Sequence, residues 1–131
     1  MTEKEIKRVE EAVSCPDSAY IPKVPDAGRV RVDDKGNRHQ LMHNGVVVSA
    51  DGYYGEFNTR IVELLKGHHE PQEEKAFYEV LKAIPPRSTM IELGSYWAYY
   101  SLWFHKAVEG ARNFMIEPAK APLECGNLST I

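Results

Sequence analysis

The sequence lacks long apolar runs and concentrated basic clusters. No apolar run approaches the roughly 20 residues that a membrane-spanning helix needs. The charged start MTEKEIKRVEEAV has no apolar stretch of the kind found in secretory signals, so we expect no export. The longest basic cluster is Lys7-Arg8 and the formal net charge is -3, which argues against nucleic acid and a membrane surface as partners.

Cysteine is also scarce. The two cysteines, Cys15 and Cys125, lie far apart and form no C-x-x-C pattern. We interpret them as reduced thiols of a cytoplasmic protein rather than as a disulfide or a metal site. The chain has 131 residues, of which 43% are hydrophobic and 27% charged, and these values are typical of one globular domain.

The N-terminal part, residues 1–27, is predicted to be a helix followed by a linker. Residues 3–14 carry an apolar stripe at helical spacing, with charged residues between its members. Thr2 and Glu5 have the spacing of a capping box, in which each residue satisfies a backbone N–H group of the other. The stretch that follows is rich in proline and is expected to be irregular.

Residues 28–55 show the alternation of polar and apolar side chains that is typical of half-buried strands. Turn-forming residues interrupt this alternation at 33–37 and at Asn44-Gly45, a strong hairpin signal. We therefore expect a small antiparallel β-meander. It contains no catalytic pattern, and its expected role is to cover an edge or to shape a pocket wall.

Two further helices are predicted from apolar stripes within 57–65 and 77–84. Gly67 is a natural end for the first, and Pro71 suits the first turn of the second. Four residues between them raise the question of a metal site: His68, His69, Glu70 and Glu73. Their spacing is not that of an H-E-x-x-H motif, so we predict loop and helix-start chemistry and no bound metal.

The segment that carries the chemistry begins after Pro85-Pro86. Residues 89–94 are predicted to be a short strand ending in a glycine turn, residues 95–106 a helix, and residues 113–118 a second strand ending in an acid and a proline. A strand, a helix and a strand in this order form a βαβ unit with two parallel strands.

The ends of these two strands predict a nucleotide cradle. Gly94 lets the chain turn sharply and lets a ligand approach the backbone without a side chain in the way. The start of the helix presents unpaired N–H groups to that ligand. Glu117, roughly 20 residues after Gly94, is placed to accept hydrogen bonds from the hydroxyls of a ribose.

The residues around Gly94 favour S-adenosylmethionine over a dinucleotide. A dinucleotide site needs G-x-G-x-x-G, but Tyr96 and Tyr99 stand at the later glycine positions. Glu92 would repel a phosphate, whereas it could hold the ammonium group of an amino acid. S-adenosylmethionine has a ribose and an amino-acid group and no phosphate.

The strings MIELGSYWAYYSLWF and FMIEP resemble the first two cofactor motifs of class I methyltransferases, and most closely those of the FkbM-type family. That family shows an acid-x-Gly-x-x-x-Gly-x-x-Ser pattern, from which Ala98 departs at the second glycine. The upstream string GHHEPQEEKAFYEVLKAIP is similar to the family's Glu-Pro helix. The resemblance implies a set of cofactor-binding residues: Glu92, Gly94, Ser95 and Tyr96 at the methionine part, Glu117 at the ribose, Ser101 near the cofactor end of the helix, and Glu70 at the mouth of the site.

The expected fold class is α/β, with an incomplete Rossmann-like sheet over residues 56–131 that is preceded by helices and a small antiparallel β-meander. The resemblance implies transfer of a methyl group from S-adenosylmethionine to a hydroxyl of a sugar or related metabolite, which would be a small-molecule or glycan acceptor. A complete domain of this family has a larger sheet, so we expect the chain to be its cofactor-binding N-terminal half, with the catalytic base unassigned.

Three alternatives stay open. The chain could be a catalytically inactive truncated remnant, an interaction module, or an NAD-type nucleotide-binding domain, which the missing glycines disfavour. A two-stranded parallel sheet leaves an unpaired apolar edge, which predicts self-association. The aromatic residues of 96–104 could stack a sugar, but we expect most of them to pack in the core.

Overall fold

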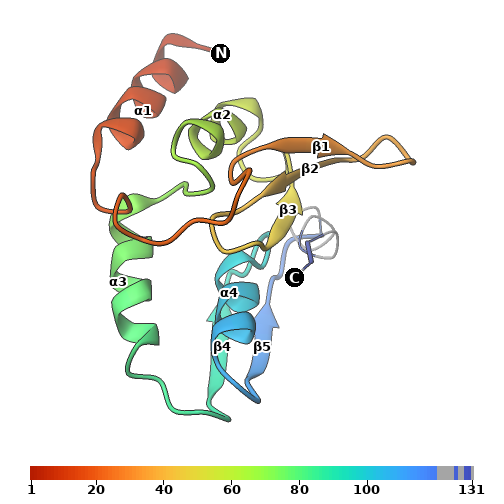
Figure 1. The fold of residues 1–131 in the computed structure, drawn as a ribbon. Coiled ribbons are helices and arrows are strands. Elements are labelled where there is room, and N and C mark those ends of the chain that lie inside the picture. The colour runs from red at the N-terminus through yellow and green to blue at the C-terminus, as the bar shows by residue number, and fades with distance from the viewer. Residues whose placement is uncertain (121–125, 127–128, 131) are drawn as a thin grey trace.

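The computed structural model describes residues 1–120, 126, 129 and 130, and within them the fold is mixed α/β, as predicted (Figure 1). These residues form four helices, a three-stranded antiparallel sheet and a two-stranded parallel sheet. No helix among them is long and apolar enough to cross a membrane. The helices are α1 (Glu3–Ser14), α2 (Glu56–Leu64), α3 (Pro71–Leu81) and α4 (Tyr99–Ala107), and the strands are β1 (Val30–Val32), β2 (Arg38–Leu41), β3 (Val47–Ser49), β4 (Thr89–Leu93) and β5 (Arg112–Ile116).

The capping box predicted for α1 is confirmed. Glu5 N donates to Thr2 Oγ1 at 3.3 Å, and Thr2 N donates to Glu5 Oε2 at 2.6 Å. Two of the N–H groups that would otherwise be unpaired at the helix start are therefore satisfied. The helix packs against α2, and Val9 is its buried residue.

The predicted meander is also confirmed, as the antiparallel sheet β1-β2-β3. Gln40 in its central strand is 1% exposed, and its side-chain amide donates to Gly28 O and to Thr59 O, both at 2.9 Å. A buried amide with both N–H groups paired avoids the cost of an unsatisfied donor. Gln40 thereby ties the meander to α2, which contains Thr59.

The parallel strands β4 and β5 pair over their full length, from Thr89 opposite Arg112 to Leu93 opposite Ile116. The connection between them is α4, which packs against both strands (Figure 1). The predicted βαβ unit is thus confirmed. Because both strands run in the same direction, their carboxyl ends lie side by side. This brings Gly94 and Glu117 to one edge of the sheet.

The start of α4 differs from the predicted helix over residues 95–106. The helix begins at Tyr99, and the preceding residues form a turn in which Gly94, Tyr96 and Ala98 have φ values of 76°, 45° and 63°. Ala98 N donates to Ser95 O at 2.6 Å and closes this turn. Left-handed backbone cannot continue a right-handed helix. Residues 94–98 therefore form a loop between β4 and α4, which we call the cradle loop or Gly94 loop, rather than the first turn of α4.

The core joins the meander to α4. Tyr99 is 0% exposed and packs with residues of the meander, of α2 and of α4. The expectation that most aromatic residues of 96–104 lie in the core is confirmed, with Tyr96 and Tyr100 only partly buried. The main buried cluster consists of Ile21, Met42, Val46, Val48, Val62, Trp97, Tyr99 and Trp103.

The face of the parallel sheet that α4 does not cover is apolar and exposed. Two cross-strand pairs form it, Ile91 with Phe114 and Leu93 with Ile116. Their exposed fractions are 64%, 59%, 76% and 53% respectively. An apolar surface of this kind on a two-stranded sheet marks a site where another surface can pack.

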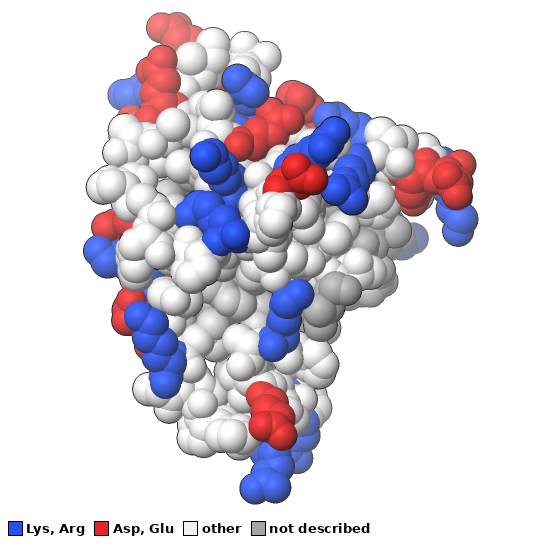
Figure 2. Space-filling view, viewed as in Figure 1, with Lys and Arg blue, Asp and Glu red and all other residues white. Residues whose placement is uncertain are grey.

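Surface charges are mixed in sign on the face shown in Figure 2, where Lys and Arg alternate with Asp and Glu over α1 and the meander. Exposed ion pairs such as Lys75 with Asp17 and Lys82 with Glu79, each at 2.8 Å, join neighbouring groups. Such pairs contribute at most about 1 kcal/mol each to stability. The fold therefore depends on the core and on the buried polar contacts.

The positive φ at Ala98 predicts that glycine is the better residue there. Left-handed backbone costs an L-residue about 1–2 kcal/mol, and the greater freedom of unfolded glycine offsets about 0.4–1 kcal/mol of the gain. We expect Ala98→Gly to raise the free energy of unfolding, measured by urea denaturation, by about 0.5–1 kcal/mol.

The matched control is Ala76→Gly in the middle of α3, where the same change should lower the free energy of unfolding by about 1 kcal/mol. Equal destabilisation by the two substitutions would contradict the left-handed turn before α4.

Candidate functional site

The loop after β4 is held against the end of β5 by backbone hydrogen bonds. Gly94 N donates to Ile116 O at 2.7 Å, and Ser95 N donates to the same oxygen at 3.3 Å. Glu117 then caps the loop, since its Oε2 accepts from Tyr96 N at 3.1 Å. Its Oε1 accepts from Ala119 N at 2.8 Å. The structure therefore brings together four of the predicted site residues.

Among the residues that the structure describes, the space beside Gly94 is open. A Cβ atom built at Gly94 would have none of their atoms within 4 Å, so glycine is required there by the backbone angle and not by packing. Glu117 is half-buried and keeps acceptor capacity, because a carboxylate has about four lone-pair sites and the two backbone N–H groups use two. A carboxylate with free lone pairs beside an open loop can accept the hydroxyls of a ligand.

Glu92 and Ser101 form a separate pair beneath α4. The hydroxyl of Ser101, which is 1% exposed, donates to Glu92 Oε2. Burial raises the pKa of Glu92, and the hydrogen bond from Ser101 offsets only part of that rise. Glu92 thus lies on the α4 side of the sheet, and its carboxylate contacts the helix rather than the Gly94 loop.

Glu70 is connected to α4 through tyrosine hydroxyls. Tyr100 Oη donates to Glu70 Oε2 and Tyr53 Oη donates to Glu70 Oε1, both at 3.4 Å. Burial raises the pKa of Tyr53 and of Tyr100, so both hydroxyls stay protonated as donors at neutral pH. Glu70 therefore lies between the first turn of α4 and the meander, although it does not touch the Gly94 loop.

A buried cluster around Glu74 is the feature that the sequence did not predict. Glu74 is 0% exposed; its Oε2 pairs with His68 Nδ1, and its Oε1 accepts from His69 N at 2.9 Å. His69 Nδ1 lies 2.7 Å from the same Oε1, close enough for an ion pair although the angle falls short of a hydrogen bond. On its other side, His69 Nε2 lies 3.1 Å from Glu70 Oε2.

The charges within this cluster stabilise one another. Burial alone would raise the pKa of Glu74, but the hydrogen bonds from His68 and His69 hold it well below its usual range. Burial likewise lowers the pKa of His69, but Glu70 and Glu74 outweigh it and raise that pKa to about 9. At neutral pH the cluster is therefore a protonated His69 between two carboxylates.

His43 extends the cluster into the hairpin of the meander. Its ring stacks on that of His68 with centroids 4.1 Å apart, and its Nδ1 lies 3.1 Å from Pro22 O. Nitrogen and oxygen atoms of His43, His68 and Glu74 all lie within 4.8 Å of one another, a spacing that could hold a metal ion.

The ring geometry of the two histidines does not suit metal binding. The rings are within 14° of parallel, so their in-plane lone pairs do not converge, and Glu74 already serves two histidines. We interpret the group as a hydrogen-bonded cluster.

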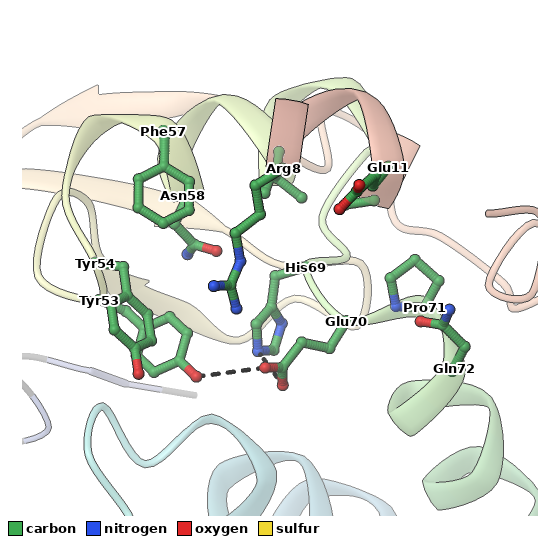
Figure 3. Close-up of a pocket in the computed structure, with 12 residues that line it drawn as sticks. Arg8, Glu11, Tyr53, Tyr54, Phe57, Asn58, His69, Glu70, Pro71 and Gln72 are labelled. Atoms are coloured by element: carbon green, nitrogen blue, oxygen red, sulfur yellow. Dashed lines mark hydrogen bonds and ion pairs between the residues drawn. The ribbon is translucent and has the colours of Figure 1, made fainter. Parts of the chain in front are cut away.

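A pocket of about 230 Å³ opens on one side of Glu70 (Figure 3). Tyr53 and Tyr54, which follow β3, form part of its wall. Tyr53 also stacks on Trp97 of the cradle loop with ring centroids 4.7 Å apart. The lining residues are Arg8, Glu11, Ala12, Tyr53, Tyr54, Phe57, Asn58, Ile61, His69, Glu70, Pro71 and Gln72.

The chain matches no protein family, and no curated protein or solved structure is significantly similar to it.

The raised pKa of His69 predicts a loss of stability in alkaline solution. The imidazole titrates near 6.5 in the unfolded chain and near 9 in the folded one, so its contribution is complete below pH 6.5 and is lost as the pH rises through about 9. We expect the free energy of unfolding, measured by urea denaturation, to fall by about 3 kcal/mol over this interval.

His69→Gln should flatten this pH dependence, whereas His105→Gln on the exposed side of α4 should retain it. A parent protein whose free energy of unfolding is level between pH 6.5 and pH 9 would show that His69 is not charged in the folded state.

Proposed function

We propose that this chain carries the S-adenosylmethionine-binding part of a class I methyltransferase of the FkbM type. The observation that carries the proposal is the contact between the two strand ends, in which the Glu117 carboxylate after β5 is fixed at the Gly94–Tyr96 loop after β4. In this proposal the β4-α4-β5 unit is the first part of a Rossmann-like domain.

The cradle supplies groups for the ribose and the methionine part of the methyl donor. The lone pairs left on Glu117 accept the ribose hydroxyls, and the space at Gly94 among the described residues leaves room for the methionine part. Glu92 acts with Ser101 as the rear wall of the cradle, because its carboxylate is already hydrogen-bonded to α4.

The same loop disfavours a pyrophosphate. Tyr96 and Ala98 take left-handed backbone angles while bearing side chains, so the bare backbone of a dinucleotide loop is missing. The Glu117 carboxylate at the end of β5 faces the loop, where a phosphate would be repelled. A donor without phosphate is therefore the better fit.

Methyl transfer from a sulfonium needs the acceptor to be positioned in line and its proton to be removed. The acceptor we propose is a hydroxyl of a sugar or related metabolite. The described residues give no assignment of the base, because the pKa of Glu70 is lowered and His69 is already protonated at neutral pH. The lack of a pairing pattern for the cysteines leads us to propose a cytoplasmic protein. Among the described residues the β4-β5 sheet has only two strands, so we also propose that it pairs with a further surface.

Binding of the two candidate nucleotides tests the proposed donor. We expect the parent chain to release or absorb heat with S-adenosylmethionine in titration calorimetry and to give none with NAD. Glu117→Ala should weaken binding at least about tenfold, since hydrogen bonds to a charged group contribute about 1.5–3 kcal/mol. Glu109→Ala, in the exposed turn after α4, is the matched control and should bind as the parent does.

Heat with NAD instead, or parent affinity in Glu117→Ala, would contradict the proposed donor. Absence of heat with both ligands would favour the inactive remnant or interaction module.

The exposed face of the parallel sheet supports a second proposal, that the chain self-associates. Four large apolar side chains at 53–76% exposure form a surface that water solvates poorly. We expect the parent to show concentration-dependent association in sedimentation velocity, and Leu93→Lys with Phe114→Lys to shift it to monomer. Val32→Lys, at an equally exposed strand position in β1, is the control and should leave association unchanged. A parent protein that stays monomeric at all concentrations would contradict the proposed self-association.

A further inference from the structure

The pocket beside Glu70 adjoins the cradle but is distinct from it. Tyr53 belongs to both, since it lines the pocket and stacks on Trp97 of the cradle loop. Tyr54 lies parallel to Tyr96 with ring centroids 6.1 Å apart, and Glu70 contacts the first turn of α4 through Tyr100. A ligand in this pocket would thus be separated from the cradle loop by a single layer of aromatic side chains.

The charges in the pocket leave one cation without a counter-ion. Glu11 lies 3.8 Å from Lys7, and Glu70 is paired with the protonated His69. Arg8 has no carboxylate within ion-pair distance among the residues that the structure describes, and its guanidinium lies 6.0 Å from the Tyr54 ring centroid. Figure 3 shows its side chain extending from α1 into the pocket toward His69 and Glu70.

The remaining wall is suited to a hydroxylated ring. Tyr53, Tyr54 and Phe57 present flat apolar faces, and Asn58 and Glu70 provide polar groups that can bind hydroxyls. The volume of about 230 Å³ lies below the range of about 300–1,000 Å³ typical for larger ligands, which limits the occupant to a single small ring.

We infer that this pocket is a sugar-binding site beside the cradle and that its occupant is a monosaccharide bearing an anionic group, carboxylate or phosphate, recognised by Arg8. This inference goes beyond the proposed methyltransferase function, because the aromatic layer between the pocket and the cradle loop keeps the occupant out of reach of the donor methyl group. Arginine suits the role because its planar guanidinium binds carboxylate and phosphate oxygens in pairs. Because Arg8 is on α1, the N-terminal helix becomes part of the site.

Binding of three sugars to the full chain tests the inference. The probes are glucose, glucuronate and glucose 6-phosphate, and dissociation constants are measured by titration of ¹⁵N-labelled protein followed by NMR. At least one of the two anionic sugars should bind about fivefold more tightly than glucose and should shift the amide resonances of Tyr54 and Asn58. The two anions distinguish carboxylate from phosphate recognition.

Arg8→Gln should reduce the affinity for the preferred anion to that for glucose, because glutamine keeps the helix propensity but not the charge. Arg112→Gln, at the opposite end of the parallel sheet, is the matched arginine control and should bind as the parent does. Equal affinity for all three sugars, no binding of any of them, or parent affinity in Arg8→Gln would overturn the inference.

Binding of S-adenosylmethionine and of the sugars, measured on the same protein samples, distinguishes the methyltransferase proposal from the inference about the pocket. Cofactor binding without sugar binding overturns the sugar pocket alone. Sugar binding without binding of S-adenosylmethionine overturns the methyltransferase proposal alone.

Discussion

The buried carboxylate of Glu74 is the interaction on which the arrangement of the candidate site depends. It binds His68 and His69, and through them it fixes the stacked ring of His43 in the hairpin and the carboxylate of Glu70 beside α4. A buried charge that loses its partner costs about 3–5 kcal/mol, so these contacts hold the meander, α3 and α4 in one relative position. The pocket and the cradle loop are both built on that position.

The local features of the fold were predictable from the sequence because their causes are local. The capping box at Thr2 and Glu5, the turn at Asn44-Gly45 and the strand-helix-strand order after Pro86 all depend on residues that are close in the chain. The position of Glu117 at the Gly94 loop also followed, since parallel pairing alone brings the carboxyl ends of two strands together.

The features that the sequence did not predict depend on contacts between residues that are far apart in the sequence. His43 and Glu74 lie in different elements, and only the packed fold shows that both meet His68. The neighbouring residues His68 and His69 both contact the carboxylate of Glu74, a contact that the spacing of residues in the sequence does not indicate. The late start of α4 was missed for a different reason, because Tyr96 and Ala98 adopt backbone angles that their side chains disfavour.

Amide resonances of the cradle test most directly whether the Gly94 loop and Glu117 bind S-adenosylmethionine. In an NMR titration of ¹⁵N-labelled protein with the methyl donor, the amides of Gly94, Ser95, Tyr96 and Ala119 should shift in a saturable manner, while those of β1 and β2 stay in place. Shifts confined to the meander, or none at saturating donor, would contradict the account.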